Sequence, residues 1–149
     1  MKFSTKGRYG LKAMFDLAMN YGDGPITLKN IAQRQDISEH YLEQLIATLR
    51  RAKLVKSVRG AQGGYMLNHP PEEITVGAII RSLEGPVGPA DCVMDADSEE
   101  CRNQESCVTR LVWARIQESV NDVIDTTTLA HMLEDQEKIN NKKNYMFYI

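Results

Sequence analysis

The chain has 149 residues, of which 42% are hydrophobic and 26% are charged, and this is the composition of an ordinary globular protein. No run reaches the length of about 18 apolar residues that a membrane span requires, and the first part of the chain carries charges instead of a signal-peptide core. We therefore expect a cytoplasmic protein without a membrane partner.

The formal net charge of -2 hides an uneven distribution. Residues 1–60 contain 11 Lys and Arg against 5 Asp and Glu, a balance of +6, while the remainder carries -8. Lys and Arg bind nucleic acid because they displace counterions from its phosphates, so the basic N-terminal part suggests a DNA-facing end. The same charge distribution would arise if both parts of the chain simply had charged faces exposed to solvent, so the motifs must decide between these interpretations.

Apolar residues spaced i, i+3, i+4 and i+7 predict three amphipathic helices in the basic part. The first covers residues 7–21, Thr27 caps a short second helix, and Ser38 caps the third. In the third helix the apolar set is Leu42, Leu45, Ile46 and Leu49, and the opposite face carries His40, Glu43, Gln44 and Arg51. A short connection between two such helices predicts a helix-turn-helix motif.

Two short strands follow, at residues 54–58 and 65–67, joined by a glycine-rich turn. Glycine tolerates a positive φ at a hairpin tip, so this segment predicts a wing. Arg59 is the long cation beside small residues, and such a tip can enter a minor groove, where the potential of A·T-rich tracts attracts Arg.

Thr75 caps a further helix that ends near Gly85. Residues 86–106 hold three Gly or Pro, six acids and two cysteines, which predicts irregular structure unless a bound group orders it. A long helix then begins near Cys107, and its heptad-like stripe predicts a dimer interface, although packing on its own domain gives the same pattern. The stripe is Val112, Trp113, Ile116, Val120, Val123 and Ile124.

A last short helix begins at Thr128, residues 138–144 are expected to be polar and mobile, and residues 145–149 are apolar. The predicted fold is therefore mainly α with a small β-hairpin wing. It comprises a winged helix-turn-helix domain at 1–85, a cysteine loop at 86–106, and a dimerisation helix and tail at 107–149.

Three thiols, Cys92, Cys101 and Cys107, lie within sixteen residues. In an acidic loop they can converge on a soft metal without a regular backbone between them. Spacing alone leaves open an iron-sulfur cluster, structural zinc, a thiol redox switch or no ligand, and zinc would want a fourth Cys or His.

Three segments, residues 4–11, 37–45 and 54–65, resemble the IscR/NsrR/CymR family of winged-helix regulators, and the resemblance extends nearly end to end through the Cys92-x8-Cys101-x5-Cys107 loop. It implies a homodimer joined through the long helix and bound to a pseudo-palindromic double-stranded DNA operator. The recognition helix would enter the major groove and Arg59 the minor groove. The candidate DNA contacts are Ser38, His40, Glu43 and Gln44 at base edges, Arg50, Arg51, Lys2, Lys6 and Arg8 at phosphates, and Arg59 with Gly60 in the wing.

The resemblance also favours an iron-sulfur cluster on the three cysteines, with 2Fe-2S preferred to 4Fe-4S. Some relatives use a His three residues past the third Cys, where this chain has Arg110, and others use an acid near the start of the first helix, where it has Arg8. The fourth ligand stays open. A partner residue could serve, as could Asp91, Asp95, Glu99, Glu100, Gln104 or Glu105, whereas His69 and His131 are expected to be structural or exposed.

One branch of the family, the cysteine-metabolism repressors, lacks the cysteines but ends in a tail like residues 144–149. In that branch the partner is O-acetylserine thiol-lyase, so Ile149 is a candidate contact for this enzyme, unless the tail packs on its own dimer. The predicted function is a transcription regulator, expected to be a repressor, controlled by an iron-sulfur cluster. The alternative is control by the partner enzyme, with the thiols acting as a redox switch or zinc site.

The sequence does not favour an enzyme. It has no nucleophile-base pair by motif, no phosphate-binding glycine loop and no metalloprotease helix. A small electron carrier would explain the cysteines but not the wing.

Overall fold

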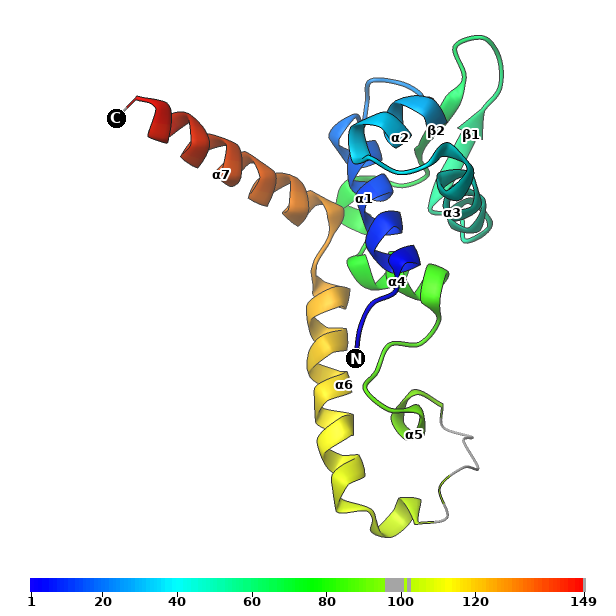
Figure 1. The fold of residues 1–149 in the computed structure, drawn as a ribbon, viewed down its shortest axis with the longest axis vertical. Coiled ribbons are helices and arrows are strands. Elements are labelled where there is room, and N and C mark those ends of the chain that lie inside the picture. Colours follow the sequence, from blue (N-terminus) through cyan, green and yellow to red (C-terminus); the bar gives the residue numbers. More distant parts are fainter. Residues whose placement is uncertain (96–100, 102, 149) are drawn as a thin grey trace.

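The computed structural model describes residues 1–95, 101 and 103–148. Its N-terminal body contains helices α1 (Thr5–Met19), α2 (Leu28–Gln35) and α3 (Glu39–Arg51), followed by strands β1 (Val55–Val58) and β2 (Gly64–Leu67) (Figure 1). The mainly α fold with a small hairpin is therefore confirmed.

Side-chain caps explain where α2 and α3 begin. Thr27 Oγ1 accepts a hydrogen bond from the Asn30 amide at 3.2 Å, and Ser38 Oγ accepts one from the Tyr41 amide at 3.2 Å. Between the helices Asp36 adopts a left-handed conformation with φ 53°, which a short polar side chain tolerates better than most. The predicted helix starts and the tight turn between them are confirmed.

The hairpin is antiparallel, with Val55 opposite Leu67 and Val58 opposite Gly64. Ile26 extends it, because its backbone exchanges hydrogen bonds of 2.9 and 2.8 Å with Tyr65. A Cβ at Gly64 would collide with the Ile26 carbonyl, so glycine lets this segment lie against the wing.

The main core lies among α1, α2, α3, the wing, α4 (Val76–Glu84) and the start of α7 (Leu129–Phe147). Its fully buried members include Met14, Ile31, Leu42, Leu49 and Leu129. Inside the body the buried carboxylate of Asp16 receives two hydrogen bonds from Arg34, at 2.7 and 2.9 Å, and one from Gln35 at 3.1 Å. The buried charge is thus paired, as burial in a low dielectric demands, and it ties α1 to α2.

A second, smaller cluster connects the body to the long helix α6 (Val108–Thr126). The turn η1 (Pro71–Glu73) leads to α4 (Val76–Glu84), whose Val76 and Ile80 pack with Val87 and with Ile124 of α6. Thr75 caps α4 by accepting a hydrogen bond from Ala78 at 3.1 Å, as predicted. From this junction α6 runs away from the body (Figure 1).

The segment before α6 is more regular than predicted. It contains α5 (Asp91–Met94), which packs beside α6, and the turn η2 (Gln104–Ser106). Glu99 and Glu100, two candidate metal ligands, lie outside the described residues.

The prediction of a short last helix with a mobile stretch at 138–144 is wrong. The structure has one continuous helix, α7 (Leu129–Phe147), which projects from the body (Figure 1). A capping box starts it, since Thr128 and His131 each accept the other's amide hydrogen bond. Further along α7, hydrogen bonds between side chains four residues apart support the helix, such as that from Gln136 Nε2 to Asn140 Oδ1 at 3.0 Å. The helix contains no Gly or Pro. Ile149 lies outside the described residues.

Among the described residues, none of the helices has both the length and the apolar composition needed to cross a bilayer.

Candidate nucleic-acid interface and cysteine segment

Helix α3 exposes a polar face because the apolar residues on its opposite face are buried in the core. Leu42, Leu45, Ile46 and Leu49 are at most 3% exposed. Ser38 and three polar residues of the opposite face, His40, Glu43 and Gln44, are all exposed. Gln44 Nε2 lies 3.4 Å from His40 Nε2, so the two side chains share one hydrogen bond and one patch of surface.

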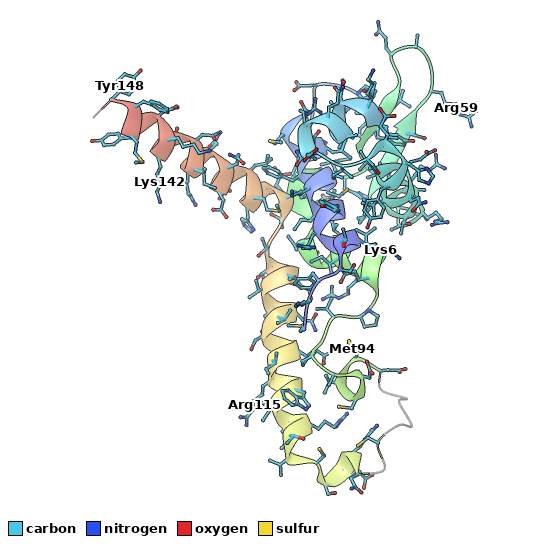
Figure 2. The ribbon with its side chains drawn as sticks, viewed as in Figure 1. Lys6, Arg59, Met94, Arg115, Lys142 and Tyr148 are labelled. Carbon is cyan, nitrogen blue, oxygen red and sulfur yellow. The ribbon has the colours of Figure 1, made fainter. Side chains whose placement is uncertain are left out.

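The wing packs against α3 through β1. Arg59 is exposed and projects from the hairpin (Figure 2). Gly60 has φ 115°, and a Cβ added to it would meet no atom within 4 Å, so the tip is narrow and uncrowded. Arg50 donates a hydrogen bond of 3.4 Å from Nη1 to Ser57 Oγ of β1, which connects α3 to the wing.

Three predicted phosphate contacts, Lys2, Lys6 and Arg8, are exposed near the start of α1. Lys6 shares a cavity of about 340 Å³ with Arg51 of α3, so the structure brings two predicted contacts together. Tyr41 and Thr48, which were not among the predicted contacts, also line this cavity.

The thiols lie at the far end of α6. Cys92 is half-buried in α5, Cys107 is the half-buried N-cap residue of α6, and Cys101 is exposed. Arg110 donates a hydrogen bond of 3.2 Å from Nε to the Cys92 carbonyl, linking α5 to α6. The hydrogen bond with Thr109 Oγ1, followed by the Arg110 backbone amide, lowers the pKa of the Cys107 thiol, which favours the thiolate that binds metals.

The three thiols lie close together in the sequence, and thiolates are the ligands that a soft metal or an iron-sulfur cluster prefers. The described residues do not form such a metal site, however. Within 1–95, 101 and 103–148, no group of three His, Cys, Asp or Glu side chains lies close enough to hold a metal. His131 serves as a helix cap and the Nδ1 atom of His69 lies 4.0 Å from Glu73 Oε2, in line with the expectation that both are structural or exposed.

An ion-pair network at the base of α6 was not foreseen. Arg81 of α4 donates two hydrogen bonds to Asp125, at 2.6 and 2.8 Å, and one to Asn121 at 2.9 Å. Arg81 lowers the pKa of Asp125, chiefly through these hydrogen bonds. The start of α4 is held at the same place, because the Val76 amide donates to the Thr127 carbonyl at 2.8 Å.

Much of α6 faces solvent with apolar side chains. The exposed ones are Val108, Leu111, Val112, Trp113, Ile116 and Val123. Ile124 is buried and Val120 is half-buried against the smaller cluster, so only part of the predicted stripe packs on the chain itself. This many exposed apolar side chains on one helix are typical of an interaction site.

The exposed polar face of a helix-turn-helix beside a narrow basic wing defines a winged-helix DNA-binding protein. A family model named Rrf2, described as an iron-dependent transcriptional regulator, matches residues 3–135. The chain therefore belongs to the Rrf2 family of transcriptional regulators.

Relatives with two different names resemble the chain over most of its length. The HTH-type transcriptional regulator CymR of Bacillus subtilis is 48% identical over 149 residues, covering all of both chains. Its solved structure, titled as the global cysteine regulator, matches with a TM-score of 0.76 and 49% identity over 89% of this chain and 95% of that one. The solved IscR of T. potens matches with a TM-score of 0.77 and 51% identity, covering 93% and 90%. The regulator IscR of Erwinia tasmaniensis is 39% identical over 137 residues, covering 92% and 81%.

These relatives are named as transcriptional regulators, so the predictions of family, fold and a non-enzymatic role are confirmed.

Proposed function

We propose that the chain is a homodimeric regulator that binds a pseudo-palindromic operator, with α3 in the major groove and the wing in the adjacent minor groove. One observation carries the proposal. The polar face of α3 and the cation Arg59 are both exposed and lie on neighbouring elements that Arg50 ties together. Half-sites would lie roughly 10 bp or a multiple apart, since two recognition helices must meet the same side of the duplex.

Individual residues have distinct parts in this proposal. Gln44 can pair with adenine and Glu43 can accept from cytosine N4, while Ser38 and His40 lie close enough to contact base edges. Lys2, Arg8 and Arg50 add phosphate contacts that carry no sequence information. Arg59, with Gly60 beside it, occupies the minor groove.

Operator binding by an Arg59→Ala variant tests the wing. We expect the loss of a minor-groove cation to weaken specific binding sharply at moderate salt, with partial recovery in Arg59→Lys. Lys142→Ala is the matched control, because it removes the same charge from α7, away from the wing (Figure 2). Equal affinity of wild type and Arg59→Ala would contradict the minor-groove role.

Control by an iron-sulfur cluster on Cys92, Cys101 and Cys107 is the finer part of the proposal. It is supported by the three free thiols beside α6, the lowered pKa of Cys107 and the iron-dependent description of the family. Such a cluster, when bound, supplies redox chemistry. The chain's own part would be to supply Cys92 from α5 and Cys107 from the start of α6, two elements that the hydrogen bond from Arg110 to the Cys92 carbonyl links. Asp91, Asp95, Gln104, Glu105 or a partner residue remain candidates for the fourth position.

Purification without oxygen tests this assignment. We expect a coloured protein with iron and acid-labile sulfide, preferably in the ratio of a 2Fe-2S cluster, and loss of colour in Cys92→Ala. Stoichiometric zinc without sulfide would replace the cluster by a structural site, and a metal-free protein whose thiols oxidise reversibly would favour a redox switch.

A second candidate is control by a partner enzyme. The relative titled as a global cysteine regulator favours it, and the tail residues Tyr145, Met146, Phe147 and Tyr148 are 74–92% exposed. The proposed partner is O-acetylserine thiol-lyase, with Ile149 as its contact. A variant truncated after Asn144 should lose any effect of this enzyme on operator affinity, whereas an effect that survives truncation would exclude the tail.

A further inference from the structure

The cavity shared by α1 and α3 has the chemistry of an anion site. Its lining residues include two cations, Lys6 and Arg51, together with Thr48 and Gln44. None of the lining residues is acidic, and within the described residues neither cation has a salt-bridge partner. Two unpaired cations beside one hollow attract an oxyanion.

The guanidinium of Arg51 is positioned in advance. Arg51 Nη2 donates a hydrogen bond of 3.1 Å to Thr48 Oγ1, and Thr48 Oγ1 donates in turn to the Gln44 carbonyl at 3.2 Å. Holding a long side chain before binding reduces the entropy lost when a ligand arrives. Arg presents several donors in a fixed plane, which suits the oxygens of a phosphate.

Glu84, the acidic residue at the end of α4, forms its hydrogen bonds outside this cavity. Glu84 follows Leu83, which also lines the cavity. Its carboxylate accepts hydrogen bonds from the Ser4 hydroxyl at 2.5 Å and the Gly7 amide at 3.1 Å. It therefore neutralises the N-terminal end of α1 and leaves the charge of Lys6 available.

We infer that this cavity seats a single phosphate of the DNA backbone, held jointly by Lys6 and Arg51 and supported by Thr48. The inference rests on the proposed function and deepens it. Gln44 belongs both to the cavity and to the exposed face of α3, so a phosphate held here lies beside the groove that this face enters. One phosphate contacted from two helices fixes how far α3 enters the groove.

The seat also lies next to the junction with α6. Leu83 forms part of its wall, and Arg81 of the same helix is bound to Asp125. Helix α4 therefore contributes residues both to the cavity and to the contact with α6.

Salt dependence distinguishes one shared phosphate from two separate contacts. Operator affinity is measured against salt concentration for wild type, Lys6→Ala, Arg51→Ala and the double variant, with Lys142→Ala as the charge-matched control. Each neutralised phosphate contributes about 0.9 to the slope of log affinity against log salt. We expect the double variant to lose about 0.9 and the control to lose nothing. A loss of about 1.8, twice the contribution of one phosphate, would indicate two phosphates and overturn the inference.

Neutral DNA linkages provide the second measurement. Single methylphosphonates are placed along the operator selected by the wild-type protein. We expect one position in each half-site to weaken wild type while leaving the double variant unaffected. If no position behaves in this way, the shared seat is wrong even though the operator is bound, whereas failure to select any operator contradicts the proposed function itself. Equal thermal unfolding midpoints for wild type and variants exclude misfolding as the cause.

Inorganic phosphate at constant ionic strength distinguishes the source of the ligand. We expect no saturable competition with operator binding. Competition that disappears in the double variant would assign the cavity to a free oxyanion and overturn the assignment to DNA.

Discussion

Arg81 and Asp125 form a two-point ion pair that joins the DNA-binding body to the long helix α6, with N–O distances of 2.6 and 2.8 Å. Beside it Val76 bonds to the Thr127 carbonyl, and Leu129 bonds to the Ile74 carbonyl at 3.0 Å. The start of α4 and the corner between α6 and α7 are therefore fixed to one another. We therefore expect a change in residues 91–107 to reach α3 in part through this junction.

Breaking the pair should loosen that connection. Asp125→Asn is expected to lower the free energy of unfolding by about 0.5 to 1 kcal/mol, a small value because both side chains are partly exposed to solvent. Operator affinity should fall as well, by roughly 5-fold or more, in the range of ordinary allosteric couplings. Urea unfolding and fluorescence anisotropy measure the two quantities.

Asp122→Asn is the control for this experiment, because Asp122 is exposed on the same helix and has no ion pair among the described residues. Equal operator affinities of the two variants would show that the junction does not transmit information.

Gly77 permits the close approach of α4 to α6. A Cβ there would collide with the Asp125 carboxylate and lie 2.8 Å from Arg81 Nη1. Gly→Ala inside a helix normally stabilises by about 0.5 to 1 kcal/mol. We expect the opposite sign for Gly77→Ala, measured as a lower unfolding midpoint, with recovery when Asp125→Ala is added. An unfolding midpoint above that of wild type would show that Asp125 and Arg81 can move to accommodate the added Cβ without loss of stability.

The ion pair should also depend on pH. Hydrogen bonds from Arg81 lower the pKa of Asp125 in the folded chain, so its stabilising contribution is complete above the unfolded pKa of about 3.9. It is lost as pH falls through the lower folded value, because protonation removes the charge. The difference in unfolding midpoint between wild type and Asp125→Asn should therefore persist from about pH 7 to about pH 5 and shrink below about pH 4. A difference that grows on acidification would contradict this assignment.

The sequence predicted the body and wing because each signal there is local. Thr27, Ser38 and Thr75 lie next to the helices they cap, and the buried face of α3 follows from periodicity alone. The start of α7 at Thr128 was predicted, but its length was not, because residues 138–144 carry no apolar stripe. Their helical structure follows the capping box at Thr128 and local polar pairs.

The candidate site was only partly predictable for a related reason. Lys6 and Arg51 were separate predictions, and nothing in their spacing indicates that they share a cavity. Arg81 and Asp125 are 44 residues apart, and their pairing depends on how α4 packs against α6. The three cysteines were found by spacing, but the short helix of Cys92 and the capping position of Cys107 are visible only in the folded chain.

The exposed apolar face of α6 should mediate dimerisation. Leu111 is 58% exposed, and placing a charge there should prevent association, because an unpaired carboxylate would be buried in the interface. We expect Leu111→Asp to sediment as a monomer. Ile139→Asp is the matched control, since Ile139 is 50% exposed on α7. A monomer produced by the control and not by Leu111→Asp would assign the interface to α7 instead.

Selection of bound sequences from a pool of random duplex DNA tests the central claim most directly. The purified chain should enrich an inverted repeat with half-sites roughly 10 bp or a multiple apart and A·T-rich steps where the wing enters. The Arg59→Ala variant, selected in parallel, should lose the preference at those steps while keeping the major-groove bases. Enrichment of no sequence, or of a site without two-fold symmetry, would contradict the account of a homodimer that reads DNA with α3 and the wing.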